Sequence, residues 1–316
     1  MPDRILTSAQ AINEALAIMG ERDKNVLLMG QGIDDKGAFY GTTSGLSHIY
    51  KERLIETPVS ENAMVGVAIG LAMSGKRPVI QFHRVEFALL AMEQIINNAA
   101  KMHYISNGQH KCPLVIRMIV GRGWAQGPCH SQSLEAMFAY IPGLKVLMPT
   151  FPEDYKGMLI SAIEDDNPVV ILEHRWTHYA KGHVPEGYYE SDITKPKQIR
   201  RGKDATIVTT AYATLSQMED DDSDLFDLRV LRPLILDDII ESVRKTGKLL
   251  IIDTGYKTLG IGAEIVARCV ETGLKFDLIR QGIPDHPIPS SRGYLRAIYP
   301  DQSPSDIPNP QFKGSF

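Results

Sequence analysis

Cysteine is scarce in this sequence, with Cys112, Cys129 and Cys269 the only three in a chain of 316 residues. An odd number of widely separated cysteines does not make a disulfide framework, and it fits a reducing compartment. A secretory leader has an apolar stretch preceded by basic residues, and the first residues of this sequence contain no such stretch. We therefore expect a cytoplasmic protein.

Long apolar runs and an excess of charge of one sign are also missing. No segment reaches the roughly 18 consecutive apolar residues that a membrane-spanning helix needs. The formal net charge is −4, and the lysines and arginines form no basic stripe. We therefore expect neither a membrane nor a nucleic acid as a partner.

What the chain does have is enough apolar content for a large core. Hydrophobic residues make up 43% of it and charged residues 23%, which is ordinary for a globular protein, and its length allows two domains. Short apolar strands alternate with helices: strands are predicted at 25–30, 53–57, 77–82, 113–120, 145–148 and 168–173, and helices at 8–20, from 61 onward, and at 86–102, 133–141 and 152–165. This alternation predicts an α/β fold, a parallel sheet covered by helices on both faces.

A polar, irregular stretch then separates this pattern from a second one. The residues between about His183 and Asp204 are rich in proline, glycine and charge, which is typical of a linker. Beyond it, strands are predicted at 205–211, 227–231, 248–253 and 276–281, and helices at 237–246 and 261–272. We therefore expect a first domain over residues 1–185, a linker over 186–203, and a smaller α/β domain over 204–316.

One acid stands out at the start of a predicted helix. In the run from Thr57 to Gly75 only Glu61 is charged, Pro58 ends an extended approach, and Ser60 is a candidate N-cap. The helix dipole favours an acid in the first turn of any helix, so Glu61 by itself does not define a site. Its interest lies in what else is expected nearby.

A histidine in a glycine-rich loop is the second feature. His130 follows the segment Gly121–Gly127 and leads into a predicted helix, an arrangement used where backbone comes close to a ligand. Glu61, Phe87 and this loop each follow the carboxyl end of a predicted parallel strand, where functional groups of such sheets collect. We therefore expect them at one cleft.

Taken together, segments along most of the chain resemble one family: the β subunit of the thiamine-diphosphate-dependent first component of 2-oxo acid dehydrogenase complexes, of the pyruvate and branched-chain types, in the transketolase-like superfamily. The segments, in chain order, are Leu54–Glu61, Phe87–Lys101, Gly108–Arg117, His130–Ala136, Ile141–Val146, Asp166–His174, Asp227–Leu234 and Gly260–Ile265. The resemblance implies a pyrimidine-binding domain followed by a transketolase C-terminal-like domain.

The resemblance also implies roles for single residues. Glu61 would hydrogen-bond the aminopyrimidine of thiamine diphosphate, Phe87 would lie against that ring, and His130 would position or protonate the oxo-acid adduct. Gln31 stands where the family has an acid after the first strand, and Glu93 keeps the acid of the second helix. Both would lie near the cofactor.

Two metal ions follow from the same resemblance. A potassium ion would be held largely by main-chain oxygens of Leu114, Ala162, Ile163, Asp165 and Asn167. The superfamily holds the diphosphate through Mg²⁺ with a Gly-Asp-Gly motif, and this sequence contains none. The resemblance therefore implies an α-type subunit that supplies the diphosphate and Mg²⁺ site, in an α2β2 tetramer.

The implied reaction is decarboxylation of a 2-oxo acid with transfer of the acyl group to a lipoyl-bearing acyltransferase. Two alternatives stay open: a split transketolase or acyloin-type carbon-carbon transferase, and a non-catalytic regulatory β-like subunit. The bulky loop residues Ile119, Arg122 and Trp124, where the family favours small ones, indicate a substrate or partner other than plain pyruvate. Gln31, in place of the family's acid, together with this loop leaves room for the non-catalytic alternative.

Overall fold

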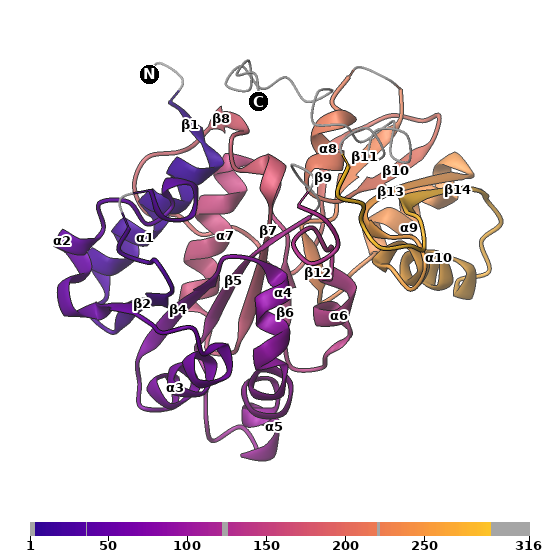
Figure 1. The fold of residues 1–316 in the computed structure, drawn as a ribbon. Coiled ribbons are helices and arrows are strands. Elements are labelled where there is room, and N and C mark those ends of the chain that lie inside the picture. The colour runs from indigo at the N-terminus through magenta and orange to yellow at the C-terminus, as the bar shows by residue number, and fades with distance from the viewer. Residues whose placement is uncertain (1–3, 36, 122–125, 220–221, 292–316) are drawn as a thin grey trace.

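A computed structural model describes residues 4–35, 37–121, 126–219 and 222–291. It shows two α/β units side by side, an N-terminal and a C-terminal layer, each made of one main sheet and the helices that cover it (Figure 1). Arg122 and Trp124 lie outside these residues. Within them, no helix is long and apolar enough to cross a membrane. The predicted alternation of strands and helices is confirmed in both layers.

The N-terminal sheet has seven strands among the described residues, in the order β12-β6-β7-β5-β4-β2-β3. All neighbours are parallel except β12 and β6. The strands are β2 (Val26–Gly30), β3 (Leu54–Glu56), β4 (Arg77–Phe82), β5 (Val115–Val120), β6 (Lys145–Leu147), β7 (Val169–His174) and β12 (Val230–Arg232). A separate antiparallel pair joins β1 (Ile5–Thr7) to β8 (Lys181–His183).

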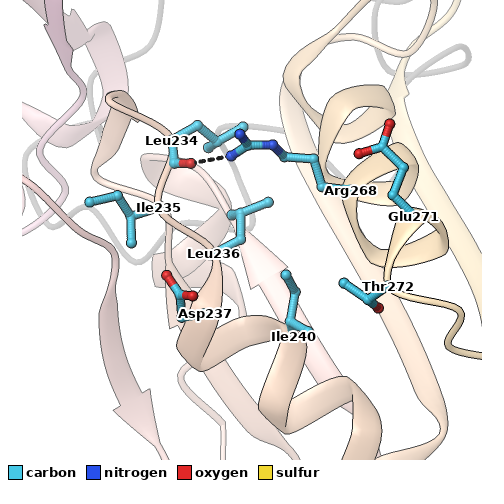
Figure 2. Close-up of a pocket in the computed structure, with 8 residues that line it drawn as sticks. All are labelled: Leu234, Ile235, Leu236, Asp237, Ile240, Arg268, Glu271 and Thr272. Carbon is cyan, nitrogen blue, oxygen red and sulfur yellow. Dashed lines mark hydrogen bonds between the residues drawn. The ribbon is translucent and has the colours of Figure 1, made fainter.

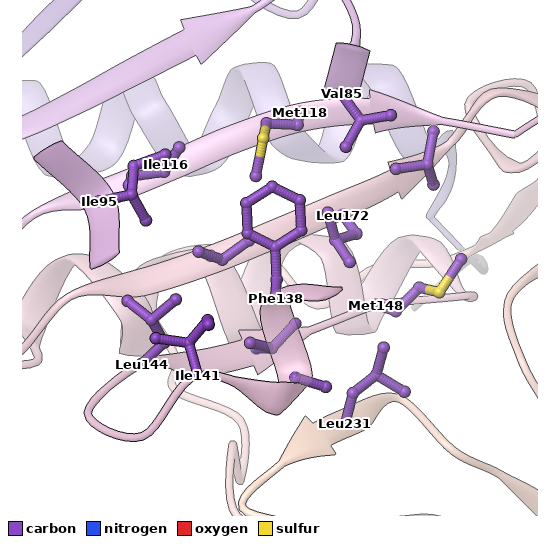
Figure 3. Packing of buried hydrophobic residues seen from close by; sticks show 14 of the residues in the cluster. Val85, Ile95, Ile116, Met118, Phe138, Ile141, Leu144, Met148, Leu172 and Leu231 are labelled. Atoms are coloured by element: carbon purple, nitrogen blue, oxygen red, sulfur yellow. The ribbon is translucent and has the colours of Figure 1, made fainter. Parts of the chain in front are cut away.

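Helices cover both faces of this sheet. One face packs against α1 (Ser8–Arg22) and α7 (Pro152–Glu164), and α2 (Ser47–Tyr50) lies beside α1. The other face packs against α3 (Glu61–Met73), α4 (Val85–Ala88), α5 (Met102–Ile105) and α6 (Glu135–Tyr140). Figure 3 shows Phe138 of α6 directed at Met118 and Leu172 of the sheet. Because both faces are covered, β5 and β7 are buried along their whole length, which explains why they are mostly apolar; their charged residues, Arg117 and Glu173, pair with each other.

The C-terminal sheet has the order β14-β13-β10-β11-β9 in the part of the chain that the structure describes. Its strands are β9 (Lys197–Arg200), β10 (Thr206–Thr209), β11 (Asp224–Asp227), β13 (Lys248–Tyr256) and β14 (Asp277–Ile283), and its helices are α8 (Tyr212–Ser216), α9 (Asp237–Thr246) and α10 (Ile261–Glu271). Only β9 runs antiparallel to its neighbour. This strand lies inside the stretch expected to be a linker.

A second difference concerns the strand predicted at 227–231. The chain instead forms β11 in the C-terminal sheet, then crosses over and forms β12 at the edge of the N-terminal sheet, where Val230 pairs with Leu147. A short apolar run has the same pattern in either sheet, so the pattern did not show the crossing.

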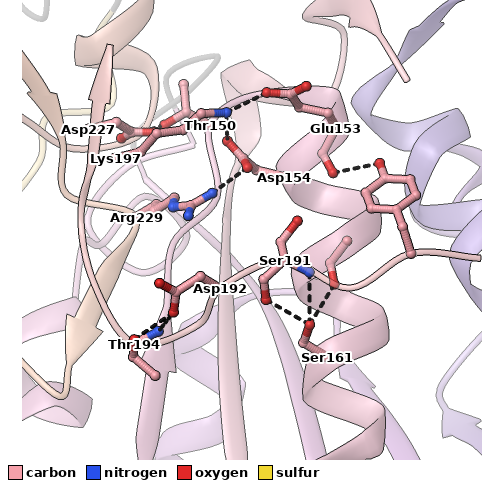
Figure 4. Close-up of polar contacts among 12 residues, drawn as sticks. Thr150, Glu153, Asp154, Ser161, Ser191, Asp192, Thr194, Lys197, Asp227 and Arg229 are labelled. Carbon is pink, nitrogen blue, oxygen red and sulfur yellow. Dashed lines mark hydrogen bonds and ion pairs between the residues drawn. The ribbon is translucent and has the colours of Figure 1, made fainter. Parts of the chain in front are cut away.

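Polar contacts fasten the two layers at this crossing (Figure 4). The carboxylate of Asp154 in α7 pairs with Arg229, which precedes β12, and with Lys197 of β9. Along the connecting stretch, Ser191 donates its main-chain N–H to Ser161 Oγ at 3.0 Å. The segment between the domains is therefore held against α7.

A third difference is the continuous helix predicted at 86–102. The chain forms α4, the 3-10 turn Leu89–Ala91, the π-helical turn Gln94–Asn98, the 3-10 turn Ala99–Lys101 and α5. Asparagine side chains compete with helical hydrogen bonding, and here Asn98 donates to Gln94 Oε1 at 2.9 Å. Wide π turns are rare and occur often at functional sites.

Candidate functional site

Two predicted residues meet where β2 ends and α3 begins. Glu61 is the first residue of α3, it is 6% exposed, and its Oε1 accepts a hydrogen bond from Gln31 Nε2 at 3.4 Å. The turn that carries Gln31 is fixed by Glu56, whose carboxylate accepts the main-chain N–H groups of Gly32 and Ile33 at 2.7 and 2.9 Å. The role of Glu56 was not predicted from the sequence, although a carboxylate at the end of a predicted strand is a signal that could have indicated it.

The start of α3 differs in one detail from the expectation. The Ser60 side chain makes no capping hydrogen bond; its carbonyl accepts the N–H of Met64 at 2.9 Å. The free N–H groups of the first turn and the positive end of the helix dipole therefore lie at the same end of the helix as Glu61. Ser60 is thus the N-cap residue, as predicted, although its side chain takes no part in the cap, and the predicted acid lies in the first turn of the helix.

Phe87 and His130 lie together at the next strands along the same edge. Phe87 belongs to α4 after β4, His130 to the loop after β5, and their ring centroids are 5.6 Å apart at 62°. The loop is tied down by the N–H of Gln132, which donates to Glu86 Oε1 at 2.7 Å. His130 Nδ1 is buried and makes no hydrogen bond within the described residues. Such a nitrogen is available to a polar ligand.

Glu93 stands apart from this pair. It is exposed, and its carboxylate accepts hydrogen bonds from Gln94 Nε2 at 2.5 Å and from Asn98 Nδ2 at 3.3 Å. Gln94 also reaches Asn62, the neighbour of Glu61 on α3, at 3.5 Å. Glu93 is therefore linked to the start of α3 through side chains of the π turn, and makes its own bonds within that turn.

Of the residues expected to hold potassium, Ala162 and Ile163 lie in the last turn of α7, Asp165 and Asn167 lie between α7 and β7, and Leu114 directly precedes β5. The carbonyl oxygens of Ile163 and Asp165 both accept hydrogen bonds from Arg77 Nη1, at 2.9 and 3.0 Å. Lys145 pairs with the Asp165 carboxylate, and the Leu114 carbonyl accepts the N–H of Val169. The turn thus gathers oxygens around cationic side chains, at the edge of the sheet opposite Glu61.

Two buried arginines at the carboxyl edge were not predicted from the sequence. Arg84 comes two residues after β4 and Arg175 directly after β7, and they are 6% and 5% exposed. Both donate to Gln126 Oε1, at 3.0 and 2.5 Å. A basic residue just past the end of a buried strand is the signal that could have found them.

A buried ion-pair network lies below this edge. Arg117 of β5 donates to both oxygens of Glu173 of β7, at 2.6 and 3.1 Å, and His178 Nε2 lies 2.8 Å from Glu173 Oε2. Burial by itself would raise the pKa of Glu173, but Arg117 and His178 lower it to about 2. Glu173 is therefore ionised at neutral pH and its charge is balanced locally.

A groove of about 430 Å³ lies elsewhere, between α9 and α10 of the C-terminal layer (Figure 2). Arg268 spans it to the carbonyl of Leu234. None of the residues predicted for the site lines it. The groove therefore does not belong to the edge that holds Glu61 and His130.

Comparison with known proteins agrees with this architecture. The chain matches the family described as transketolase, pyrimidine binding domain, over residues 5–178, and transketolase, C-terminal domain, over residues 195–303. It is 38% identical to the acetoin:2,6-dichlorophenolindophenol oxidoreductase subunit beta of Cupriavidus necator, with 91% of each chain covered. It is also 38% identical to the 2-oxoisovalerate dehydrogenase subunit beta of Bacillus subtilis, with 87% and 86% covered, and to the pyruvate dehydrogenase E1 component subunit beta of Rickettsia bellii, with 83% of each covered.

The chain belongs to the β-subunit family of the 2-oxo acid dehydrogenase first component. The family and the enzyme class predicted from the sequence, dependent on thiamine diphosphate, are thereby confirmed. A solved structure described as a split gene transketolase, inactive beta4 tetramer, superposes with a TM-score of 0.74 over 96% of both chains at 20% identity. That similarity concerns the fold alone, and it confirms that this β-subunit family member consists of two α/β units in succession.

Proposed function

We propose that this chain is the β-type subunit of an enzyme that decarboxylates a 2-oxo acid, transfers the acyl group to lipoyl, and acts only with an α-type subunit. The observation that carries the proposal is the presence, at one sheet edge, of a buried helix-start carboxylate, Glu61, and of a buried His130 ring nitrogen that has no hydrogen-bond partner within the described residues. The names of the relatives support the class of reaction.

The residues at this edge fit the pyrimidine half of the cofactor. When bound, thiamine diphosphate supplies the carbon nucleophile and the electron sink for loss of carbon dioxide. Glu61 would hold a proton at ring nitrogen N1′, Gln31 would orient that carboxylate through their 3.4 Å contact, and Phe87 would pack against the ring. His130 Nδ1 would exchange a proton with the substrate oxygen. Glu93, on the π turn, would support the start of α3.

The α-type subunit would cover the exposed side of α3. Between Asn62 and Gly75 this helix has no charged residue, yet Val67 is 56% and Met73 44% exposed, and Leu90 beside it is 64% exposed. A helix that is apolar all round is normally buried. With no Gly-Asp-Gly in this sequence, the diphosphate and Mg²⁺ would be held mainly by that subunit, in an α2β2 tetramer.

We also propose a structural potassium ion at the turn between α7 and β7. A carbonyl oxygen has two lone pairs, so those of Ile163 and Asp165 could serve an ion as well as Arg77. Thermal unfolding in potassium and in choline chloride would test this, because bound K⁺ raises the midpoint. The three free cysteines support a reducing location, the cytoplasm.

The deciding experiment changes Glu61 in the complex isolated from its native host through a tag on this chain. Glu61→Gln and His130→Gln should each lower lipoyl acylation at least about 100-fold, the range for loss of a proton-transferring group. Exposed Glu241→Gln, whose side chain is 72% exposed, is the matched control. Pyruvate, 2-oxoisovalerate and acetoin serve as substrates because the relatives are named for them.

Each alternative has its own outcome in this assay. Near-normal turnover of Glu61→Gln contradicts the assigned role of that residue. A complex that joins carbon fragments with an aldehyde acceptor and ignores lipoyl is a carbon-carbon transferase. A complex in which calorimetry finds no Mg²⁺-dependent binding of thiamine diphosphate is a non-catalytic one.

A further inference from the structure

Between His130 and α6, the loop is tied to the rest of the molecule at one residue. The N–H of Gln132 donates to Glu86 Oε1 at 2.7 Å. On either side of it, the hydroxyl groups of Ser131 and Ser133 are buried and make no hydrogen bond within the described residues. The position of the loop therefore depends on this tie and on the start of α6, where the loop ends.

The start of α6 is Glu135, which faces Asp253 of β13 across the two layers. The two side chains are buried, at 1% and 4% exposed. Gly255 lies between them: a side-chain carbon at this glycine would be 2.7 Å from Glu135 Oε1 and 3.3 Å from Asp253 Oδ1. The Thr254 hydroxyl also faces Glu135 but completes no hydrogen bond with it. The two carboxyl groups thus meet at a point where the strand has no side chain.

Hydrogen bonds place the negative charge of this pair on Asp253. Its carboxylate accepts the N–H groups of Gly255 and Gly262 at 2.9 and 3.4 Å and the hydroxyl of Thr210 at 3.3 Å, and it lies at the N-terminus of α10. Neither oxygen of Glu135 makes a hydrogen bond within the part of the chain that the structure describes. Two buried carboxylates this close repel each other, so the proton of the pair belongs to Glu135.

The charged and titratable groups around the pair match one negative charge. Arg280 of β14 acts on Asp253. The phenol of Tyr256 faces Glu135, and burial, with Glu135 and Asp285, raises its pKa, so it stays neutral. Burial, and then the charge of Asp253, raise the pKa of Glu135 to about 8. The pair therefore keeps its proton at neutral pH and loses it in mildly alkaline solution.

We propose that Glu135 and Asp253 share one proton across the two layers, and that this proton holds the start of α6, and with it the His130 loop, in the reactive position. The un-ionised Glu135 donates to Asp253. Once the proton is lost, two adjacent carboxylates repel and α6 moves away from β13. Both are positioning residues, because they act through His130. The inference rests on the proposed function, in which His130 exchanges a proton with the substrate, and gives that function an alkaline limit.

Hydrogen exchange of the His130 loop in the native complex tests the positioning without turnover. At pH 7 the peptide over residues 128–134 should exchange equally in the wild type and in Glu135→Gln, whose amide also donates to Asp253. At pH 9 only about a tenth of the Glu135 groups keep a proton, so the wild-type loop should exchange at least about 5-fold faster than the variant. Comparison at a single pH removes the effect of pH on exchange itself. Equal rates at pH 9 overturn the inference.

The pH dependence of turnover tests the shared proton. In the wild type, and in the exposed control Glu241→Gln, kcat should fall about 10-fold between pH 7 and 9. The fall should be absent in Glu135→Gln and in Asp253→Asn, since each leaves one carboxyl group beside an amide donor. Glu135→Ala should lower kcat at pH 7 at least about 10-fold with KM within about 3-fold, and Glu135→Gln should restore most of this rate. A fall that persists in either amide variant contradicts the shared proton.

The two readouts distinguish failure of this inference from failure of the proposed function. If no 2-oxo acid is decarboxylated, yet the wild-type loop alone exchanges faster at pH 9, the positioning stands and the function fails. If a 2-oxo acid is decarboxylated and Glu135→Gln follows the wild type in both exchange and rate, the inference fails and the function stands. Circular dichroism verifies folding, and if Glu135→Ala does not fold, the two amide variants decide.

Discussion

Glu135, the first residue of α6, illustrates how far a single carboxyl group can be moved from its ordinary chemistry. It is 1% exposed and lies against Asp253 of β13, in the other layer, which is 4% exposed. Asp253 Oδ1 accepts the N–H of Gly255 at 2.9 Å and the Thr210 hydroxyl at 3.3 Å. Burial, and then the charge of Asp253, raise the pKa of Glu135 to about 8. At neutral pH it is therefore protonated.

This raised pKa predicts a stability that declines with rising pH. Between about pH 4.5 and 8 the folded chain keeps a proton that the unfolded chain has lost, so the free energy of unfolding falls as pH rises through this window. The slope for one group approaches about 1.4 kcal/mol per pH unit. Glu135→Gln, which cannot ionise, should flatten the dependence of the urea midpoint between pH 5.5 and 8. Exposed Glu241→Gln should keep it, and an unchanged slope in Glu135→Gln would show that another group is responsible.

Among the elements, α3 both packs on the N-terminal sheet and leaves an uncharged outer side exposed. Its buried side, with Met64, Val65 and Ala68, packs on the N-terminal sheet, while its first turn holds Glu61 at the edge. Its outer side is uncharged as well. A helix of a free-standing domain usually carries charged or polar residues there, so the sequence of α3 suits burial on both sides.

A charge on the outer side of α3 should prevent assembly without unfolding the chain. Val67 is 56% exposed, so Val67→Asp leaves the core intact but would bury a carboxylate under the partner, at a cost of several kcal/mol. We expect the co-purified α-type subunit to be lost and the circular dichroism spectrum to stay the same. Val270→Asp on α10, also at a 56% exposed valine, is the matched control. Retention of the partner by Val67→Asp would place the interface elsewhere.

At the scale of the whole molecule, charged side chains bridge the two layers. Asp154 is 2% exposed, pairs with Arg229, and lies 3.3 Å from Lys197 Nζ. Close by, the Thr150 hydroxyl donates to Asp227 Oδ1 at 2.9 Å, and burial together with Asp154 raises the pKa of Asp227 to about 7. The crossing of β12 onto the other sheet adds main-chain bonds to the same junction.

Removing the central charge of this junction should uncouple the layers. Asp154→Asn leaves the buried Arg229 guanidinium without its anion, which typically costs about 3–5 kcal/mol. We expect the midpoint of thermal unfolding to fall by several degrees and the single transition seen by calorimetry to broaden or split. Exposed Asp238→Asn on α9 serves as the control. A wild-type transition in Asp154→Asn would mean that the junction is held by other contacts.

Much of this molecule could be predicted from local patterns. The bounds of β4 and α9 agree with those predicted, because each has turn residues or acids at its ends and a clear apolar period. The placement of Glu61 at the start of a buried helix follows from the same kind of signal. The interrupted helix after β4 and the strand β9 could not be predicted in this way, because weak helix formers and polar edge strands lack a distinct apolar period.

The sequence alone specifies the order of strands and helices, the family, and which polar side chains follow the ends of the strands. That Arg84 and Arg175 meet at Gln126, and that Glu135 meets Asp253 across the layers, follows from the three-dimensional packing. The energy of two charges depends on their separation and on how well water is excluded from them, and for residues about 90 to 120 positions apart both quantities are set by packing alone.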